Sequence, residues 1–293
     1  MITSAAFADE LIPSHMTRLR LLNGIKDIET LTGLVRRQNL LFPRLPLISV
    51  GAAYSDLQPL DYLQNHSLIR FAEQSRLPLT FSAFQLVWDD FIVSMQVRRT
   101  RRSAAYFCRD CVEADRKAHS VDFWHRSHHI FGVVKCPIHQ TQLESVDPEY
   151  LATALPSTAI RENAALMPTP RCGANPAVAR YIRVSELLLK SKSDKLPVRI
   201  QRSARALLSE ARGIRRPFKQ PIAVFVDQIR QCYPAAWLRE FLPHNGKKAV
   251  IDNNQIVSIA LNKSPNVPPL LLVLAAKTVS AEQAVELVET ANV

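Results

Sequence analysis

The chain has 293 residues, roughly two domains' worth, and its 47% apolar and 22% charged residues exclude a disordered or collagen-like protein. Lysines and arginines number 37 against 26 acidic residues, so the formal net charge is +11 and a polyanionic partner such as nucleic acid is favoured. The 7 glycines are few beside 19 prolines, which predicts helices separated by prolines rather than glycine-rich phosphate loops.

The sequence shows no apolar stretch of about 18 residues, and its first residues lack the pattern of a signal peptide. A cytoplasmic protein with no membrane partner is therefore expected. Three of the five cysteines, Cys108, Cys111 and Cys136, lie within one short segment. In a reducing compartment this clustering favours metal binding over disulfides.

Residues 1–97 are predicted to form an N-terminal helical region. Apolar residues recur at helical spacing in two short segments within residues 9–38, and Asn23-Gly24 separates them. Two helices joined by such a turn have the outline of a helix-turn-helix, although a helical hairpin that only packs has the same outline. Further helices are expected at 61–75 and 82–97.

Prolines recur through residues 146–178, and this segment is predicted to be a linker. Residues 179–293 are then expected to form a basic C-terminal helical domain. Near its end, Ser280 is followed three residues later by Gln283, a spacing typical of a capping box that begins a last helix.

The positive charge gathers in two stretches, residues 98–102 and 180–219. A solvated helix end explains the first stretch equally well, because cations are favourable near a helix C-terminus. Phosphate contacts would nevertheless be sought in these stretches. The predicted nucleic-acid-binding residues are Arg98, Arg99, Arg101, Arg102, Arg199, Arg202, Arg205, Arg215 and Arg216.

The strongest chemical signal is a pair of knuckles, Cys108-x-x-Cys111 and Cys136-x-x-His139. Two intervening residues let each knuckle direct both side chains at one ion, and the two knuckles together supply a tetrahedron. Thiolates and imidazole suit Zn²⁺, and four protein ligands leave a closed, structural site. Three free cysteines with a surface histidine is the alternative. The fold class expected is mainly α: helical domains with an inserted small zinc-knuckle module, residues 98–145, that contains short β-strands.

Between the knuckles lies a box rich in histidine, and its candidate residues are Trp124, His125, Arg126 and His128. His125 and His128 could be alternative ligands or a catalytic pair, but such residues more often orient the ligands as a structural second shell. Trp124 is expected to pack beneath the module and Arg126 to be anchored by a buried acceptor. Asp115 and Asp122 are the nearest candidates in sequence for that acceptor.

These residues resemble the zinc motif of the TniQ/TnsD family of transposition proteins. The resemblance runs through the paired knuckles, the Phe123–His128 box, Gly132-Val133 and Leu143. Weaker similarity covers Asp9-Glu10-Leu11 with Arg18, and Tyr233-Pro234 with Trp237-Leu238. Arg109 departs from the family, where a proline is usual at this position.

The resemblance implies a target-site selector or adaptor for DNA transposition. Such a protein binds DNA, or a DNA-bound RNA-guided complex, and recruits a transposition AAA+ ATPase and transposase; a homodimer is left open. The alternative is a stand-alone zinc-containing DNA-binding transcription regulator. An enzyme is not expected, because the sequence has no P-loop motif and no second set of clustered carboxylates that would hold a catalytic metal.

Overall fold

The structure is a computed structural model, and part of the chain is described. The described residues are 2–38, 51–52, 54–68, 102, 104–162, 166–169, 174–191, 196–210, 227, 231–238, 273, 275–276 and 278–291. The predicted helix at 82–97 lies outside them. So do five of the predicted nucleic-acid contacts, Arg98, Arg99, Arg101, Arg215 and Arg216.

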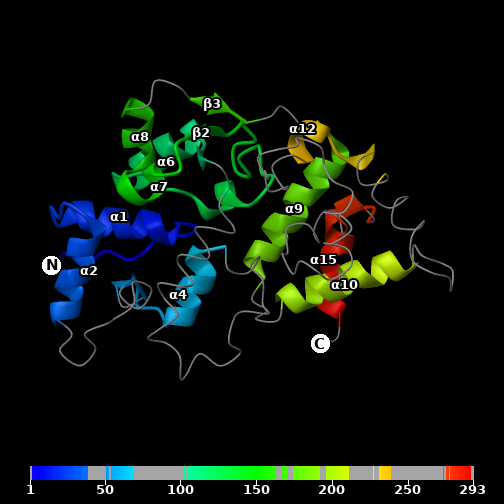
Figure 1. The fold of residues 1–293 in the computed structure, drawn as a ribbon, viewed down its shortest axis with the longest axis horizontal. Coiled ribbons are helices and arrows are strands. Elements are labelled where there is room, and N and C mark those ends of the chain that lie inside the picture. Colours follow the sequence, from blue (N-terminus) through cyan, green and yellow to red (C-terminus); the bar gives the residue numbers. More distant parts are fainter. Residues whose placement is uncertain are drawn as a thin grey trace, which may run out of the picture. The chain divides into compact units, whose positions relative to one another are not determined.

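The mainly helical fold predicted from the sequence is confirmed, and the chain divides into two compact units (Figure 1). Unit 1 comprises Met1–Ile69, Pro78–Ile130 and Lys135–Thr169, and unit 2 comprises Arg70–Leu77, Phe131–Val134 and Pro170–Val293. The N-terminal helices and the knuckle module, expected as separate regions, therefore share one compact unit.

Unit 1 contains the sheet, the knuckles and most of the short helices. Its described elements are α1 (Ile12–Leu22), α2 (Ile28–Gln38), α4 (Pro59–His66), β1 (Ala105–Phe107), α6 (Arg109–His119), the 3-10 helix η3 (Arg126–His129), β2 (Glu144–Val146), α7 (Tyr150–Thr153), α8 (Pro156–Glu162) and β3 (Met167–Pro168). Residues 146–178 were expected as a linker, but α7, α8, β3 and the start of another helix lie within them. Prolines at the first turn start helices here rather than excluding them.

A three-stranded antiparallel sheet in the order β1-β2-β3 lies beside the first knuckle. Tyr106 pairs with Ser145, and Ser145 pairs in turn with Met167. Because β1 ends at Phe107, the sheet fixes the backbone immediately before Cys108. The short strands expected in the knuckle module are thus present.

Helix α1 is buried on every side except at its C-terminal end, with Ile12 and residues 14–19 all inaccessible. Burial extends to Arg18, whose guanidinium donates to both carboxylate oxygens of Glu10 at 3.1 and 2.8 Å. The ring of His15 bonds Tyr62 Oη of α4 at 2.7 Å. His15 and Arg18 can lie inside the unit because their polar atoms have partners there, although the buried hydroxyl of Thr17 has none among the described residues.

Helix α4 ends at His66, earlier than the predicted helix 61–75. Ser67 is extended, and its hydroxyl donates to the Leu63 carbonyl at 2.6 Å. Arg126 Nη1 donates to the carbonyl of Gln64 at 2.7 Å. A cationic donor from another part of unit 1 therefore satisfies the carbonyl end of this helix, as arginines do near helix C-termini.

Trp124 lies at the centre of a buried apolar cluster in unit 1 and is 0% exposed. The other members of the cluster are Leu11, Ala105, Phe107, Val112, Val146 and Ala159. Its indole Nε1 donates to the Ala154 carbonyl at 2.8 Å, so the polar edge is satisfied within the core.

Unit 2 is built on α9 (Pro176–Lys190), α10 (Leu196–Glu210), α12 (Ala235–Leu238) and α15 (Ala281–Thr290). Helices α9 and α10 both pack against α15. Asn175 caps α9 by accepting from the amides of Ala177 and Val178. Ser280 caps α15 as predicted, since Gln283 N donates to Ser280 Oγ at 3.1 Å, but the Gln283 side chain accepts from Val279 N at 2.8 Å instead of completing the box at Ser280 N.

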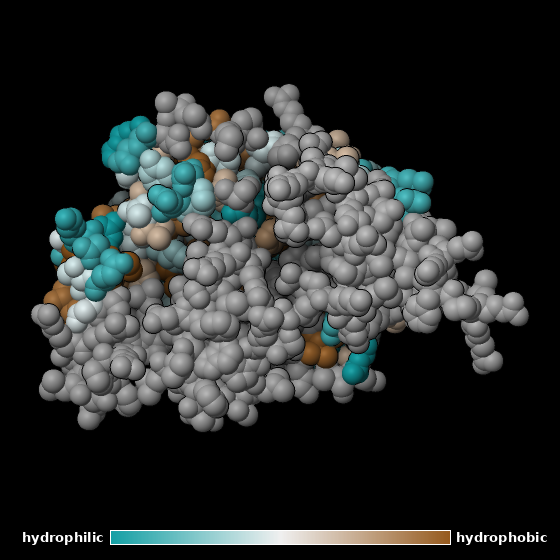
Figure 2. Space-filling model, viewed as in Figure 1, coloured by the Kyte–Doolittle hydropathy of each residue, from teal (hydrophilic) through white to brown (hydrophobic). Residues whose placement is uncertain are grey.

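The described surface of the α1 and α2 region is mixed, and Figure 2 shows hydrophobic and hydrophilic residues interspersed there. Leu21 and Leu22 of α1 are 47% and 45% exposed. Within the described part of the chain, no helix reaches the length and apolarity needed to cross a membrane.

Replacing Trp124 by alanine is expected to lower the free energy of unfolding by about 3–5 kcal/mol, because it leaves a cavity in the core of unit 1. Urea denaturation followed by circular dichroism measures the change. Leu21→Ala is the matched control on an exposed apolar side chain and should change stability by less than about 0.5 kcal/mol. Equal stability of Trp124→Ala and wild type would contradict the core assignment.

Candidate metal centre

The first knuckle is positioned by the junction of β1 and α6. Cys108 has extended backbone angles and is the N-cap residue of α6, and Cys111 lies in the first turn of that helix. Arg109, between them, donates to both carboxylate oxygens of Glu144 on β2 at 2.6 and 3.0 Å. This bidentate pair links the start of α6 to the sheet. A proline at position 109 could not form such a pair.

The second knuckle is a tight turn closed by backbone hydrogen bonds. Cys136 N donates to the Thr141 carbonyl at 2.8 Å, and Gln140 N donates back to the Cys136 carbonyl at 2.9 Å. Gln140 has a φ of 57°, the left-handed conformation that reverses the chain. The turn brings His139 next to Cys136, and the His139 amide lies 3.4 Å from Cys136 Sγ.

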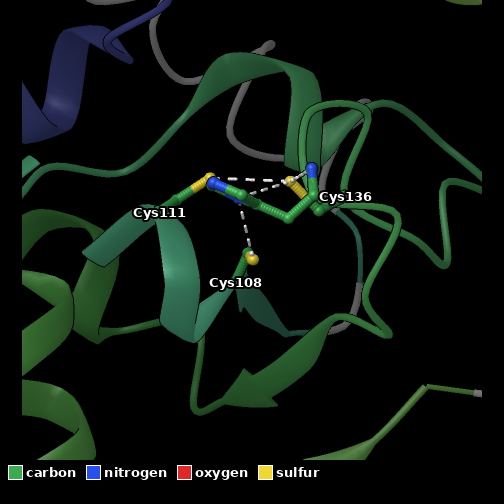
Figure 3. Close-up of side chains that lie close together, drawn as sticks. Cys108, Cys111 and Cys136 are labelled. Carbon is green, nitrogen blue, oxygen red and sulfur yellow. Dashed lines mark hydrogen bonds between the residues drawn. The ribbon is translucent and has the colours of Figure 1, made fainter. Parts of the chain in front are cut away.

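The two knuckles meet, and their four ligand atoms all lie within 4.8 Å of one another (Figure 3). Cys111 Sγ is 3.5 Å from Cys136 Sγ. His139 Nδ1 lies 3.6, 3.3 and 3.6 Å from the sulfurs of Cys108, Cys111 and Cys136. Tetrahedral Zn²⁺ separates two sulfur ligands by about 3.8 Å and a sulfur from a nitrogen by about 3.5 Å. The cluster therefore has the dimensions of a Cys₃His metal site.

The charges of the cluster also call for a cation. Hydrogen bonding from Cys111 and Cys136 lowers the pKa of the Cys108 thiol, and the hydrogen bond to Cys108 raises the pKa of Cys111. Three buried sulfurs at these distances cannot all be ionised alone, because like charges repel. A dication removes the conflict by holding all three as thiolates. The donor set thus fits a metal such as Zn²⁺.

Two polar side chains lie against the sulfurs without belonging to the ligand set. Thr141 Oγ1 is 3.1 Å from Cys108 Sγ. His128 Nε2 is 3.8 Å from Cys111 Sγ, and His128 is 1% exposed. His128 therefore lies beside a candidate ligand, and its role in orienting the ligands stays a prediction.

Arg126 is buried and anchored, as the sequence predicts, but by partners other than those nearest in sequence. Its Nε lies 3.5 Å from Asp9 Oδ1, and its Nη1 donates to the Gln64 carbonyl. Asp122 instead accepts from the amide and hydroxyl of Ser157, at 2.6 and 2.7 Å, at the start of α8. The expectation that Asp115 or Asp122 holds Arg126 is corrected accordingly.

Asp115 pairs with His125, whose Nε2 lies 2.8 Å from Asp115 Oδ2. On the other side of the ring, His125 Nδ1 faces Asp9 Oδ2 at 3.6 Å. Burial lowers the pKa of His125, but the hydrogen bonds and charges of the two carboxylates outweigh it and raise the pKa to about 9. The two carboxylates therefore favour the protonated form of the His125 ring.

Asp9 was not predicted as a site residue, yet it joins the N-terminal segment to the box. Its Oδ2 accepts from the Ser127 amide at 3.2 Å and from the Ser127 hydroxyl at 2.5 Å. Burial raises its pKa, but hydrogen bonds from His125 and Ser127 and the charge of Arg126 lower it to about 2. The sequence signal was the weak similarity at Asp9-Glu10-Leu11, which carries no information on its partner.

His129, also missed from the sequence, is held as a neutral ring. Its Nδ1 faces the His125 carbonyl at 2.9 Å, and the Tyr106 amide donates to its Nε2 at 3.1 Å. These partners require a proton on Nδ1 and none on Nε2. Burial, the main cause, lowers its pKa to about 4.

Arg102, one of the predicted nucleic-acid contacts, is buried, with an exposed fraction of 4%. Its Nη1 donates to the His128 carbonyl at 2.9 Å, and its guanidinium stacks 3.5 Å above the Tyr106 ring. A buried guanidinium cannot meet a phosphate, so we leave Arg102 out of the proposed DNA surface.

The remaining described candidates lie on α10. Arg202 is exposed, and Arg199 Nη1 donates to the Glu289 carbonyl of α15 at 3.0 Å. Arg205 lies on the same helix. These arginines belong to unit 2, whereas the Cys/His cluster belongs to unit 1.

Residues 1–143 match the TniQ family, and both knuckles, α1, α2 and α4 lie within the matched range. This domain marks a transposition-associated protein, and TniQ family proteins are non-catalytic transposition factors. No curated protein matches the sequence.

The pKa of about 9 for His125 predicts a pH-dependent loss of stability. A pKa raised above the usual 6.5 means that the contribution of protonated His125 is complete below about pH 6.5 and is lost as the pH rises through 9. Urea denaturation of the metal-loaded protein at pH 6.5 and 9.5 should show wild type losing about 2–3 kcal/mol more than His125→Gln. Parallel losses in the two proteins would refute the buried cation.

Proposed function

We propose that this chain, whose residues 1–143 form a TniQ family domain, selects target sites for DNA transposition as a non-catalytic adaptor. In this role it binds DNA, or a DNA-bound RNA-guided complex, and recruits an AAA+ ATPase and a transposase. The family match over the N-terminal half is the observation that carries the proposal.

We further propose that Cys108, Cys111, Cys136 and His139 hold one Zn²⁺. The bound ion would neutralise the charge of the thiolates and link the two knuckles. Its four protein ligands would leave no coordination position for water. Cys108, Cys111 and Cys136 are almost completely buried, which favours a structural role. His128 lies beside the sulfur of Cys111 and Thr141 beside that of Cys108, where each would help to orient a thiolate toward the ion.

DNA would be bound mainly through phosphates, as the net charge of +11 favours. The proposed contacts are Arg98, Arg99, Arg101, Arg199, Arg202, Arg205, Arg215 and Arg216. Among the described side chains, Arg202 supports this proposal most directly because it is exposed on α10.

The adaptor role is tested by assembling the complex. The tagged full chain, expressed with a candidate transposition AAA+ ATPase and transposase, should co-purify with the ATPase and direct insertions to one site. Sequencing of the bound nucleic acid separates direct DNA binding from a guide RNA. Promoter binding without ATPase capture or insertion would support a transcription regulator and contradict the adaptor.

Purified protein is expected to contain one Zn²⁺ per chain by elemental analysis. Cys111→Ser should lose the metal and lower the melting temperature, because structural zinc contributes folding free energy directly. Cys232→Ser is the matched control: Cys232 lies outside the cluster, and its loss should leave the zinc content unchanged. Folded wild-type protein free of zinc would refute the site.

Binding to duplex DNA should weaken with salt at a log–log slope of about −5, the value for roughly six phosphate contacts. Replacing Arg98, Arg99 and Arg101 together by alanine should bring this slope about 3 closer to zero, one for each lost contact. Arg102→Ala is the contrasting variant, since it should lower stability and leave the slope unchanged. A slope unaffected by the triple change would exclude this stretch from the DNA surface.

A further inference from the structure

We propose that residues 2–11, here called the N-terminal segment, are energetically part of the metal site, so that metal binding and docking of this segment strengthen each other. The inference rests on the metal proposed at the Cys₃His cluster. It assigns to Asp9 a positioning role for ligands about a hundred residues away in sequence.

The first connection runs along α6. Cys111 and Asp115 are four residues apart and therefore lie on the same face of this helix. Both are buried, at 2% and 8% exposure. A metal that fixes Cys111 also fixes the turn that carries Asp115, and Asp115 Oδ2 lies 2.8 Å from His125 Nε2.

The second connection runs through His128, whose Nε2 lies 3.8 Å from Cys111 Sγ. The rings of His128 and His125 are 4.9 Å apart, and the His128 amide donates to the His125 carbonyl at 3.2 Å. Both connections from the metal ligand therefore end at His125.

His125 in turn meets the N-terminal segment. Its Nδ1 lies 3.6 Å from Asp9 Oδ2, and Glu10 forms an isolated antiparallel bridge with His125. The Arg126 amide donates to the Asp9 carbonyl at 2.6 Å, and the Leu11 amide donates to the Trp124 carbonyl at 2.9 Å. The segment is thus seated directly on the box that lies between the two knuckles.

The backbone at the contact has an uncommon conformation. Asp9 has a φ of 65°, in the left-handed region that residues other than glycine seldom adopt, although Asp and Asn adopt it more readily than most. Such a conformation persists where the surroundings determine it. Loss of the metal would loosen Asp115 and His128, and the carboxylate of Asp9 would lose the ordered partner that keeps it in place.

Undocking would also reach α1. The buried guanidinium of Arg18 bonds Ser4 Oγ and donates to the Ala5 carbonyl at 2.6 Å, both in the N-terminal segment. Metal occupancy would therefore decide whether α1 keeps the partners of its buried charge. Coupling of this kind is reciprocal: if metal binding favours docking of the segment by a given factor, docking raises the metal affinity by the same factor. A change at Asp9 that weakens docking should therefore also weaken metal binding.

The test measures Zn²⁺ affinity of the full chain by competition with a chromophoric chelator. Asp9→Asn, which keeps the shape and tolerates a positive φ, and His125→Gln should each weaken binding about tenfold, as changes around metal ligands do. Because both act through one path, the double variant should bind no more than a few-fold more weakly than the weaker single variant.

Asp56→Asn is the matched control, since Asp56 also has a positive φ, of 52°, but is exposed. It should bind Zn²⁺ like wild type, and the Co²⁺ spectra of all variants should match because the four ligands are intact. Asp9→Asn with wild-type affinity would overturn the inference and leave the metal site standing. A wild-type chain that binds no Zn²⁺ would overturn both.

Hydrogen exchange of wild type with and without chelation of Zn²⁺ supplies a second readout. Removal of the metal should speed exchange of the Leu11 and Arg126 amides at least tenfold, while the Tyr62 amide in α4 exchanges more slowly than they do and α9 is unchanged. Unchanged protection of Leu11 and Arg126 would overturn the inference. Simultaneous loss of protection at Leu11, Arg126 and Tyr62 would also overturn it, because it would show unfolding of unit 1 rather than undocking.

Discussion

Two adjacent carboxylates near the N-terminus lie against three buried basic side chains of unit 1: Arg18, Arg126 and His125. Glu10 pairs with Arg18 at 2.8 Å, and Asp9 lies beside Arg126 and His125. A buried ion without a partner costs several kcal/mol, so these contacts are a condition for burying both arginines at all. The side chains of successive residues point in different directions here, and the N-terminal segment can therefore neutralise α1 on one side and the histidine-rich box on the other.

The metal centre imposes the second constraint on the same box. The sheet sets the backbone before Cys108, and α6 places Cys111 in its first turn. With the second knuckle, these elements bring three sulfurs and an imidazole within 4.8 Å. The box between the knuckles is consequently buried. Trp124 packs in the apolar core, and His125 and Arg126 form hydrogen bonds with other residues of unit 1. Histidine and arginine are common in catalytic sites, but in this box they contribute to the packing of unit 1.

The burial of the Cys/His cluster bears on the function proposed for this site. With a bound metal, Cys108, Cys111, Cys136 and His139 would supply all four ligands of a tetrahedral site, and its three sulfurs are buried. Such a site would stabilise the fold around the two knuckles, in keeping with the non-catalytic character of the TniQ family matched by residues 1–143. The described arginines proposed to contact DNA lie on α10, which belongs to unit 2.

The sequence by itself determined the features that depend on neighbours along the chain. The two residues between the members of each knuckle, and the two between Ser280 and its cap partner Gln283, set local geometry that does not depend on the conformation of the rest of the chain. The size and apolarity of Trp124 likewise required a core. Tertiary structure alone decided the partners of the buried charges: Arg126 is held by Asp9 and the end of α4, whereas the nearer Asp115 and Asp122 serve His125 and Ser157. It also stacked the guanidinium of Arg102 on the Tyr106 ring instead of leaving it on the surface. The physical reason is that a long-range ion pair has no characteristic spacing in sequence, because its geometry arises only when distant segments are packed together.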